Sequence, residues 1–134
     1  MAKLEDIEGI AAVQARKLRA AGVRSVEGLL KTGGTAKGRK DLAEKASVSE
    51  KLMLEWVNRA DLFRIKGVGE EYSDLLEAAG VDTVVELGTR NAANLHATLL
   101  STNQSKKVVR RVPPEKTVGG WIQQAKSLPR AISH

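Results

Sequence analysis

Two short glycine-containing segments are the parts of this sequence best suited to chemistry with an anion. We name them glycine loop 1 (residues 7–11, Ile-Glu-Gly-Ile-Ala) and glycine loop 2 (residues 65–69, Ile-Lys-Gly-Val-Gly), and each precedes a helical run. Glycine lets the backbone turn tightly and approach a ligand closely. The helix that follows presents unpaired N–H groups and the positive end of its dipole. A phosphate oxygen docks well at such a point, so both loops are predicted to bind phosphate.

The charged residues beside the two loops differ in sign. The helical run after glycine loop 1 carries a cluster of basic residues, Arg16, Lys17, Arg19 and Arg24. The run after glycine loop 2 carries four acidic residues, Glu70, Glu71, Asp74 and Glu77, with Lys66 as the only close basic residue. Each carboxylate near a phosphate opposes binding by on the order of 1 kcal/mol at a wet surface. We therefore expect glycine loop 1 to be the stronger binder, through the backbone of Gly9, Ile10 and Ala11 and the side chains of Arg16 and Lys17.

Glycine loop 2 has the more complete glycine pattern. Its expected contacts are the side chain of Lys66 and the backbone of Gly67, Val68 and Gly69. Glycine loop 1 has Ala11 in place of the second glycine. We expect the Cβ of Ala11 to turn the local N–H groups away from a ligand or to hinder close approach.

The two loops belong to an internal repeat with an offset of 58 residues. Residues 7–29 and 65–87 are identical at 9 of 23 positions, and the copies resemble each other again at 56–60 and 121–125. Gly22 and Gly80 follow helical runs, where a residue with positive φ ends a helix. Ser25 and Thr83 then stand where helix N-caps are expected. We predict two repeats, residues 1–62 and 63–134, sharing one compact body.

The remaining helix signals give an all-α fold. Thr35 is expected to cap a helix that runs to about Ala46, and Ser49 one over about 50–63 with Leu52, Trp56 and Ala60 on one stripe. Asn91 is expected to cap a run to about Leu100, and a last helix begins at Pro113-Pro114 and runs to about Ser127. Residues 101–114 read as a polar, basic connector. Trp56 and Trp121 occupy matching places in the repeat and are expected in the core.

The pattern apolar-x-Gly-apolar-Gly, followed by a helix that ends in Gly-apolar, resembles the helix-hairpin-helix family of nucleic-acid-binding motifs. Residues 65–69 with Leu75, Leu76, Gly80 and Val81 carry the resemblance, and 7–23 carries it apart from Ala11. Nearly the whole chain is similar to the tandem helix-hairpin-helix family called domain of unknown function 4332. The resemblance implies two units packed about a pseudo-two-fold, with additional helices after each. It also implies sequence-independent contacts to the DNA backbone, with a monovalent cation at the 65–69 hairpin as a further expectation.

Several function classes are excluded or disfavoured by composition. The sequence has no cysteine, which excludes disulfides, zinc–thiolate sites and thiol nucleophiles. His96 and His134 are the only histidines and have no partner at metal-ligand spacing. Gly33 and Gly38 have the spacing of a phosphate-binding P-loop, but Arg39 and Lys40 stand where Lys and Ser/Thr are required. We expect no enzyme activity, no resident metal and no cofactor.

Charge and hydropathy limit the classes of partner and the location expected for this protein. The 134-residue chain has a formal net charge of +6, with an acidic middle (residues 61–100) between two basic flanks. No segment approaches the roughly 20 apolar residues of a membrane span, and the first ten residues lack the apolar core of a signal peptide. We expect a cytoplasmic protein that binds duplex DNA. The alternative left open is a protein-interaction or adaptor domain, and the oligomeric state is not determined by the sequence.

Overall fold

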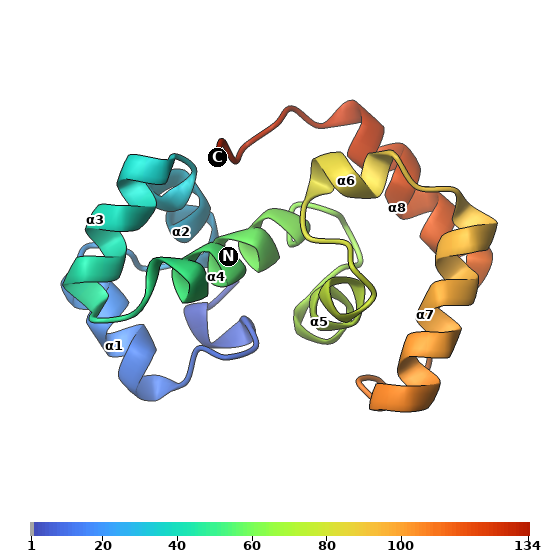
Figure 1. The fold of residues 1–134 in the computed structure, drawn as a ribbon, viewed down its shortest axis with the longest axis horizontal. Helices are drawn as coiled ribbons and strands as arrows, with labels where there is room; N and C mark the ends of the chain where they lie inside the picture. The colour runs from blue at the N-terminus through green and yellow to red at the C-terminus, as the bar shows by residue number, and fades with distance from the viewer. Residues whose placement is uncertain (1) are drawn as a thin grey trace. The chain divides into compact units, whose positions relative to one another are not determined.

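The computed structural model describes residues 2–134, and throughout that range the regular structure is helical, with no strand. The all-α expectation is confirmed. A short 3-10 helix η1 (Leu4–Asp6) precedes eight α-helices, whose order along the chain Figure 1 shows. They are α1 (Ala12–Ala20), α2 (Val26–Gly33), α3 (Ala36–Ala46), α4 (Glu50–Leu62), α5 (Glu70–Ala78), α6 (Val84–Gly88), α7 (Ala92–Lys106) and α8 (Glu115–Ser127).

Side-chain caps begin five of these helices, as the sequence predicts. The side-chain oxygens of Ser25, Thr35, Ser49, Thr83 and Asn91 each accept a hydrogen bond from the backbone N–H three residues later, at 3.0–3.2 Å. Each bond satisfies one of the N–H groups that a helix start leaves without a partner. A cap of this kind is worth about 1 kcal/mol.

Glycines end the first helix of each repeat in the same way. Gly22 and Gly80 have φ of 96° and 91°, so both adopt the positive φ that the sequence predicts. The following valine then donates its N–H back to the helix, from Val23 to Leu18 at 2.9 Å and from Val81 to Leu76 at 2.8 Å. This is the Schellman arrangement, which gives two otherwise unpaired carbonyl groups a donor.

The chain forms two compact units. Unit 1 contains the described residues up to Asp61 together with Ala131–His134, and unit 2 contains Leu62–Arg130. In unit 1, α3 packs against α1 and α2; in unit 2, α8 packs against α6 and α7, and α5 against α7. That the two repeats share one compact body stays a prediction.

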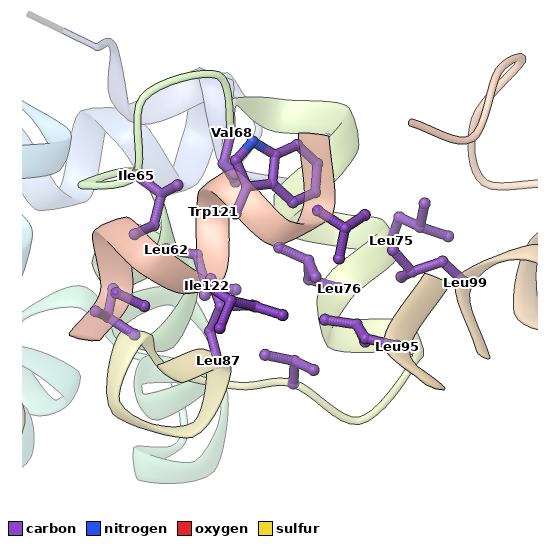
Figure 2. Close-up of a cluster of buried hydrophobic side chains, with 14 of the residues drawn as sticks. Leu62, Ile65, Val68, Leu75, Leu76, Leu87, Leu95, Leu99, Trp121 and Ile122 are labelled. Atoms are coloured by element: carbon purple, nitrogen blue, oxygen red, sulfur yellow. The ribbon is translucent and has the colours of Figure 1, made fainter. Parts of the chain in front are cut away.

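Each unit has its own buried apolar cluster. In unit 1 the fully buried side chains include Leu4, Ile7, Leu18, Leu29, Leu42, Met53 and Trp56. In unit 2 the cluster includes Leu62, Ile65, Leu75, Leu76, Leu87, Leu95, Leu99, Trp121 and Ile122, which Figure 2 shows gathered between the helices. Burying a leucine-sized side chain contributes about 1.5–3 kcal/mol, so these clusters supply the main stabilisation of each unit. The prediction that both tryptophans are core residues is confirmed.

A buried arginine ties the end of the chain to unit 1. Arg39 is 6% exposed and donates to the backbone oxygens of Gly33 at 2.9 Å and Ser133 at 2.7 Å. Ser133 donates its own N–H to Gly34 O at 2.8 Å, and Ile132 beside it is buried. Arg39 and Gly33, which at the sequence level resemble part of a P-loop, therefore serve a structural contact.

One expected helix boundary is wrong, and one expected buried stripe differs in part. Helix α7 continues to Lys106 rather than ending near Leu100. Residues 101–106 contain no glycine or proline that would end the helix, and their polar side chains are compatible with a solvent-exposed helix face. It ends where Lys107 adopts the left-handed conformation, so the connector is shorter than 101–114. In α4 the buried stripe is Met53, Trp56, Val57 and Ala60, and Leu52 is only half-buried beside it.

No helix within residues 2–134 is both long enough and apolar enough to cross a membrane.

Candidate nucleic-acid interface

Glycine loop 1 is a tight, exposed turn between η1 and α1. Gly9 has φ of 95°, and the N–H of Ile10 donates to the carbonyl of Ile7 at 3.0 Å. The side chains of Ile7 and Ile10 are buried, whereas Glu8, Gly9 and Ala11 are exposed. The two isoleucines anchor the loop in the core, and the backbone between them faces solvent.

Glycine loop 2 has the same backbone geometry. Gly67 has φ of 94°, and the N–H of Val68 donates to the carbonyl of Ile65 at 3.1 Å. Ile65 and Val68 are buried, and Lys66 and Gly67 are exposed. The sequence repeat is therefore also a repeat of local structure.

A tryptophan beneath each loop explains why its central glycine is required. A Cβ built on Gly9 would lie 3.3 Å from the indole Nε1 of Trp56, and one built on Gly67 would lie 3.2 Å from Nε1 of Trp121. A side chain at either position would meet the indole and would also hold a positive φ that L-residues rarely adopt. Both constraints select glycine.

The residue three positions after each tryptophan fixes its loop by hydrogen bonds. Arg59 donates from Nη1 to the carbonyl of Glu8 at 2.8 Å. Gln124 accepts from the N–H of Lys66 at 2.8 Å and donates to its carbonyl at 3.2 Å. Each loop is thus held from its own unit by a Trp-x-x-(Arg/Gln) pair on the last long helix.

The backbone is extended in both loops at the position where Ala11 replaces the second glycine. Ala11 has φ of −91° and Gly69, its counterpart, has φ of −121°, so both are extended. A Cβ on Gly69 would meet nothing within 4 Å. The second glycine of the pattern is therefore not needed for an extended backbone at this position, and the expected effect of the Ala11 Cβ on a ligand stays a prediction.

The free amide groups of the two loops differ. In glycine loop 1 the N–H of Ile10 is bonded to Ile7 and that of Ala11 donates to Oε1 of Gln14 at 3.1 Å. The N–H of Gly9 has no acceptor among the described residues. In glycine loop 2 Tyr72 stands where Gln14 stands in loop 1, and within residues 2–134 the amides of both Gly67 and Gly69 lack an acceptor. The N–H of Glu8 also lacks an acceptor within residues 2–134, whereas that of Lys66 donates to Gln124, so each loop offers two free amides at different positions.

The side-chain charges favour glycine loop 1. Arg16 and Lys17 are exposed on α1, and neither has an ion-pair partner in the described part of the chain. Arg19 is instead paired with Glu5, donating from Nη2 at 2.7 Å and from Nη1 at 3.1 Å. The hydrogen bond from Arg19 lowers the pKa of the Glu5 carboxyl and raises the pKa of Arg19 itself. Arg16 and Lys17 are thus available to an anion, whereas the positive charge of Arg19 is largely balanced by the carboxylate of Glu5.

Carboxylates begin the helix after glycine loop 2. Glu70 and Glu71 are exposed in the first turn of α5, where the helix dipole favours negative charge. They stabilise the helix and repel a phosphate at the same point. The two loops therefore share a geometry, but their charges differ as the sequence indicates.

The chain matches the family described as Domain of unknown function (DUF4332) over residues 8–128. The chain belongs to this family. No curated protein and no solved structure gives a match. The DUF4332 match covers residues 8–11 of glycine loop 1, all of glycine loop 2 and the helices α4 and α8 that hold the two loops.

Cation binding at glycine loop 2 stays a prediction. Three carbonyl groups of this loop already accept hydrogen bonds: Ile65 from Val68, Lys66 from Gln124 and Gly69 from Ser73. In the described part of the chain, no group of three or more His, Asp or Glu side chains is placed to hold a metal ion. A cation at the loop would therefore rely on backbone oxygens.

Sequence reasoning missed the residues that hold the loops. The repeated Trp-x-x-(Arg/Gln)-Ala pattern at 56–60 and 121–125 contained the signal, because a repeated polar residue beside a core tryptophan indicates a shared contact. The sequence places Arg111 in a basic connector, but no comparable signal paired it with Lys66. It lies 45 positions after Lys66 in the sequence, yet both line the same pocket in unit 2.

Proposed function

We propose that this DUF4332 protein is a non-catalytic tandem of helix-hairpin-helix units that binds the backbone of duplex DNA without reading its sequence. The proposal includes the pseudo-two-fold relation expected of such a tandem. Its main support is glycine loop 1, an exposed turn that opens onto α1 with two unpaired cations close behind it. The repetition of the same loop geometry at residues 65–69 supports the tandem.

A phosphate at glycine loop 1 would have donors of two kinds. The N–H of Gly9 and the first amides of α1 supply backbone hydrogen bonds, because the N–H groups of a helix start have no partner within the helix. Arg16 and Lys17 follow Ala12 and Val13 by four positions, which is about one helical turn. The side chains of Arg16 and Lys17 therefore lie on the same side of α1 as Ala12 and Val13, whose amides belong to the helix start. The small exposed side chains of Ala11 and Ala12 leave room for a backbone to approach.

The backbone N–H groups do not distinguish one base from another, and Arg16 and Lys17 do not do so when they contact phosphate. Phosphate contacts fix the register and position of a protein on DNA but carry no sequence information. In contrast to a base-reading helix, the exposed residues at the start of α1 are alanine and valine, which offer no side-chain hydrogen bonds to base edges. Sequence-independent binding follows.

Charge reversal at the two unpaired cations tests the proposal. In R16E/K17E, affinity for a 20-base-pair duplex is expected to fall by at least about tenfold, and by the same factor on two unrelated sequences. The matched control is K45E/K51E, which makes the same change in net charge at exposed positions on α3 and α4. Equal losses in the two variants would show that only net charge matters and would contradict a site at glycine loop 1.

A protein-interaction role is the second candidate. Leu100 is 48% exposed on α7, and the first turn of α5 presents Glu70 and Glu71. An apolar side chain on one helix and an acidic helix start suit a partner with a basic, partly apolar surface. This role predicts no mobility shift with duplex DNA at low salt, together with a defined partner or oligomer.

A further inference from the structure

A pocket of about 790 Å³ lies beside glycine loop 2, entirely within unit 2. Its walls come from the loop, from α5, from the segment before α8 and from α8 itself. The volume falls within the range of sites that hold small organic molecules. Glycine loop 2 contributes Lys66 and Gly67 to this pocket, and the proposed DNA contact at glycine loop 1 does not use it.

The charges that line the pocket are of one sign. Lys66 and Arg111 are its only charged residues, both are exposed, and no carboxylate lines it. Glu70 and Glu71, which made glycine loop 2 look unsuited to anions, are not among the lining residues. Two cations without a counter-charge suit a dianion, and a guanidinium group binds phosphate oxygens in bidentate fashion.

Neutral donors stand beside the two cations. Gly67 lines the pocket, and its N–H has no acceptor in the described residues 2–134. The hydroxyl of Thr117, an exposed residue, adds a second donor. This combination of charged and neutral donors is the one that proteins use for phosphate groups.

The remaining wall is apolar and partly flat. Tyr72 packs at a tilt against Trp121, with ring centroids 5.3 Å apart and planes at 53°. Pro113 and Pro114 add two further rings, and Val112 lies before them. Aromatic and proline surfaces of this kind bury a planar ring well, so an anion bound here has space for an attached ring.

Both cations stand on segments that hydrogen bonds hold in place. Gln124 bonds both backbone groups of Lys66. The segment that carries Arg111 is held by Asn103, whose side chain donates to the carbonyl of Val109 and accepts from its N–H, both at 2.9 Å. A site whose backbone is already ordered loses less entropy when a ligand binds.

We propose that this pocket binds a nucleotide, with its phosphate monoester between Lys66 and Arg111 and its base against Tyr72 and the two prolines. The same chemistry is present in a free nucleoside monophosphate and in the 5′-phosphorylated end of a nucleic-acid strand. The pocket lies in unit 2 and does not depend on the proposed duplex contact at glycine loop 1.

Calorimetric titration of the full chain tests this site with defined probes. The probes are adenosine monophosphate, adenosine, inorganic phosphate, and an eight-nucleotide single strand with and without a 5′-phosphate. Adenosine monophosphate or the phosphorylated strand is expected to bind at least about tenfold more tightly than the other three probes. Adenosine and the unphosphorylated strand lack the phosphate monoester, and inorganic phosphate lacks the base. Preference for the free nucleotide or for the strand end then identifies the source of the ligand.

Three variants locate the binding. Arg111→Ala is expected to weaken it by at least about tenfold, whereas Arg110→Ala, which removes an exposed neighbouring arginine that does not line the pocket, leaves it unchanged. Gly120→Leu should abolish it by filling the pocket. A Cβ on Gly120 meets nothing within 4 Å, so α8 tolerates the change, and circular dichroism verifies the fold.

Four results would overturn the proposal: no binding of either phosphorylated probe, equal binding in Arg111→Ala and Arg110→Ala, unaltered binding in Gly120→Leu, or inorganic phosphate binding as tightly as the nucleotide. R16E/K17E separates the two proposals. This variant should retain nucleotide binding in full. If duplex binding is not observed, the nucleotide-binding proposal is unaffected, and if nucleotide binding is not observed, the duplex-binding proposal is unaffected.

Discussion

Replacing Gly67 by alanine probes the physical reason for the glycine loops. At φ of 94° the new Cβ enters a left-handed backbone region, which costs an L-residue about 1–2 kcal/mol. The same Cβ lies 3.2 Å from Nε1 of the buried Trp121, so the indole has to shift inside a packed core. We expect a loss of about 1–3 kcal/mol in the free energy of unfolding of unit 2.

Gly69→Ala, two positions away, is the matched control. Gly69 is extended at φ of −121°, nothing lies within 4 Å of its Cβ position, and the first repeat already has Ala11 there. Alanine is a poorer N-cap than glycine, but it also reduces the entropy of the unfolded chain. These effects oppose each other, so the net change should stay within about 0.5 kcal/mol.

Urea unfolding followed by tryptophan fluorescence measures both variants. In a chain with Trp56 replaced by phenylalanine, Trp121 is the only indole and reports on unit 2. The midpoint of Gly67→Ala should fall clearly below that of Gly69→Ala. Equal midpoints would refute the reasoning, because they would show that neither the positive φ nor the indole contact selects glycine.

Three further outcomes follow from individual contacts. Gln124→Ala removes both hydrogen bonds to the backbone of glycine loop 2 and should cost about 1–2 kcal/mol in thermal unfolding, whereas a loss near zero would show that the loop holds itself. Asn103→Ala removes two bonds to Val109, so amide hydrogen exchange at residues 107–112 should accelerate at least about tenfold, and unchanged protection would contradict this. The carboxylate of Glu5 has a lowered pKa beside Arg19, so its stabilising effect is present above the ordinary value of 4.5 and is lost as pH falls through the lowered pKa. Glu5→Gln should therefore flatten the acid side of a stability–pH curve, and an unchanged curve would count against the ion pair.

The sequence predicted those parts of the fold that depend on local chemistry. Ser25, Thr83 and the other caps begin helices because their side-chain oxygens reach an N–H three residues ahead, and Gly22 and Gly80 end helices because they tolerate positive φ. Such signals lie within a few residues of their effect. They can be read without knowing the tertiary structure.

Contacts between distant segments were not predictable in the same way. Nothing near Arg111 indicates that it lines a pocket with Lys66, and nothing near Arg39 indicates that it bonds the carbonyl of Ser133. The backbone angle at the second glycine was not predictable either. Gly69 is extended, a conformation that alanine also adopts, and only the backbone angles reveal that.

The most direct test of backbone binding at the glycine loops is the salt dependence of duplex affinity. Fluorescence anisotropy with the full chain and two 20-base-pair duplexes of unrelated sequence should give log Kd rising linearly with log salt concentration between about 50 and 200 mM, by about 0.9 per neutralised phosphate. The two duplexes should give the same slope and the same affinity at each salt concentration. Absence of binding at the lowest salt, or a clear preference for one duplex, would contradict sequence-independent binding to the DNA backbone.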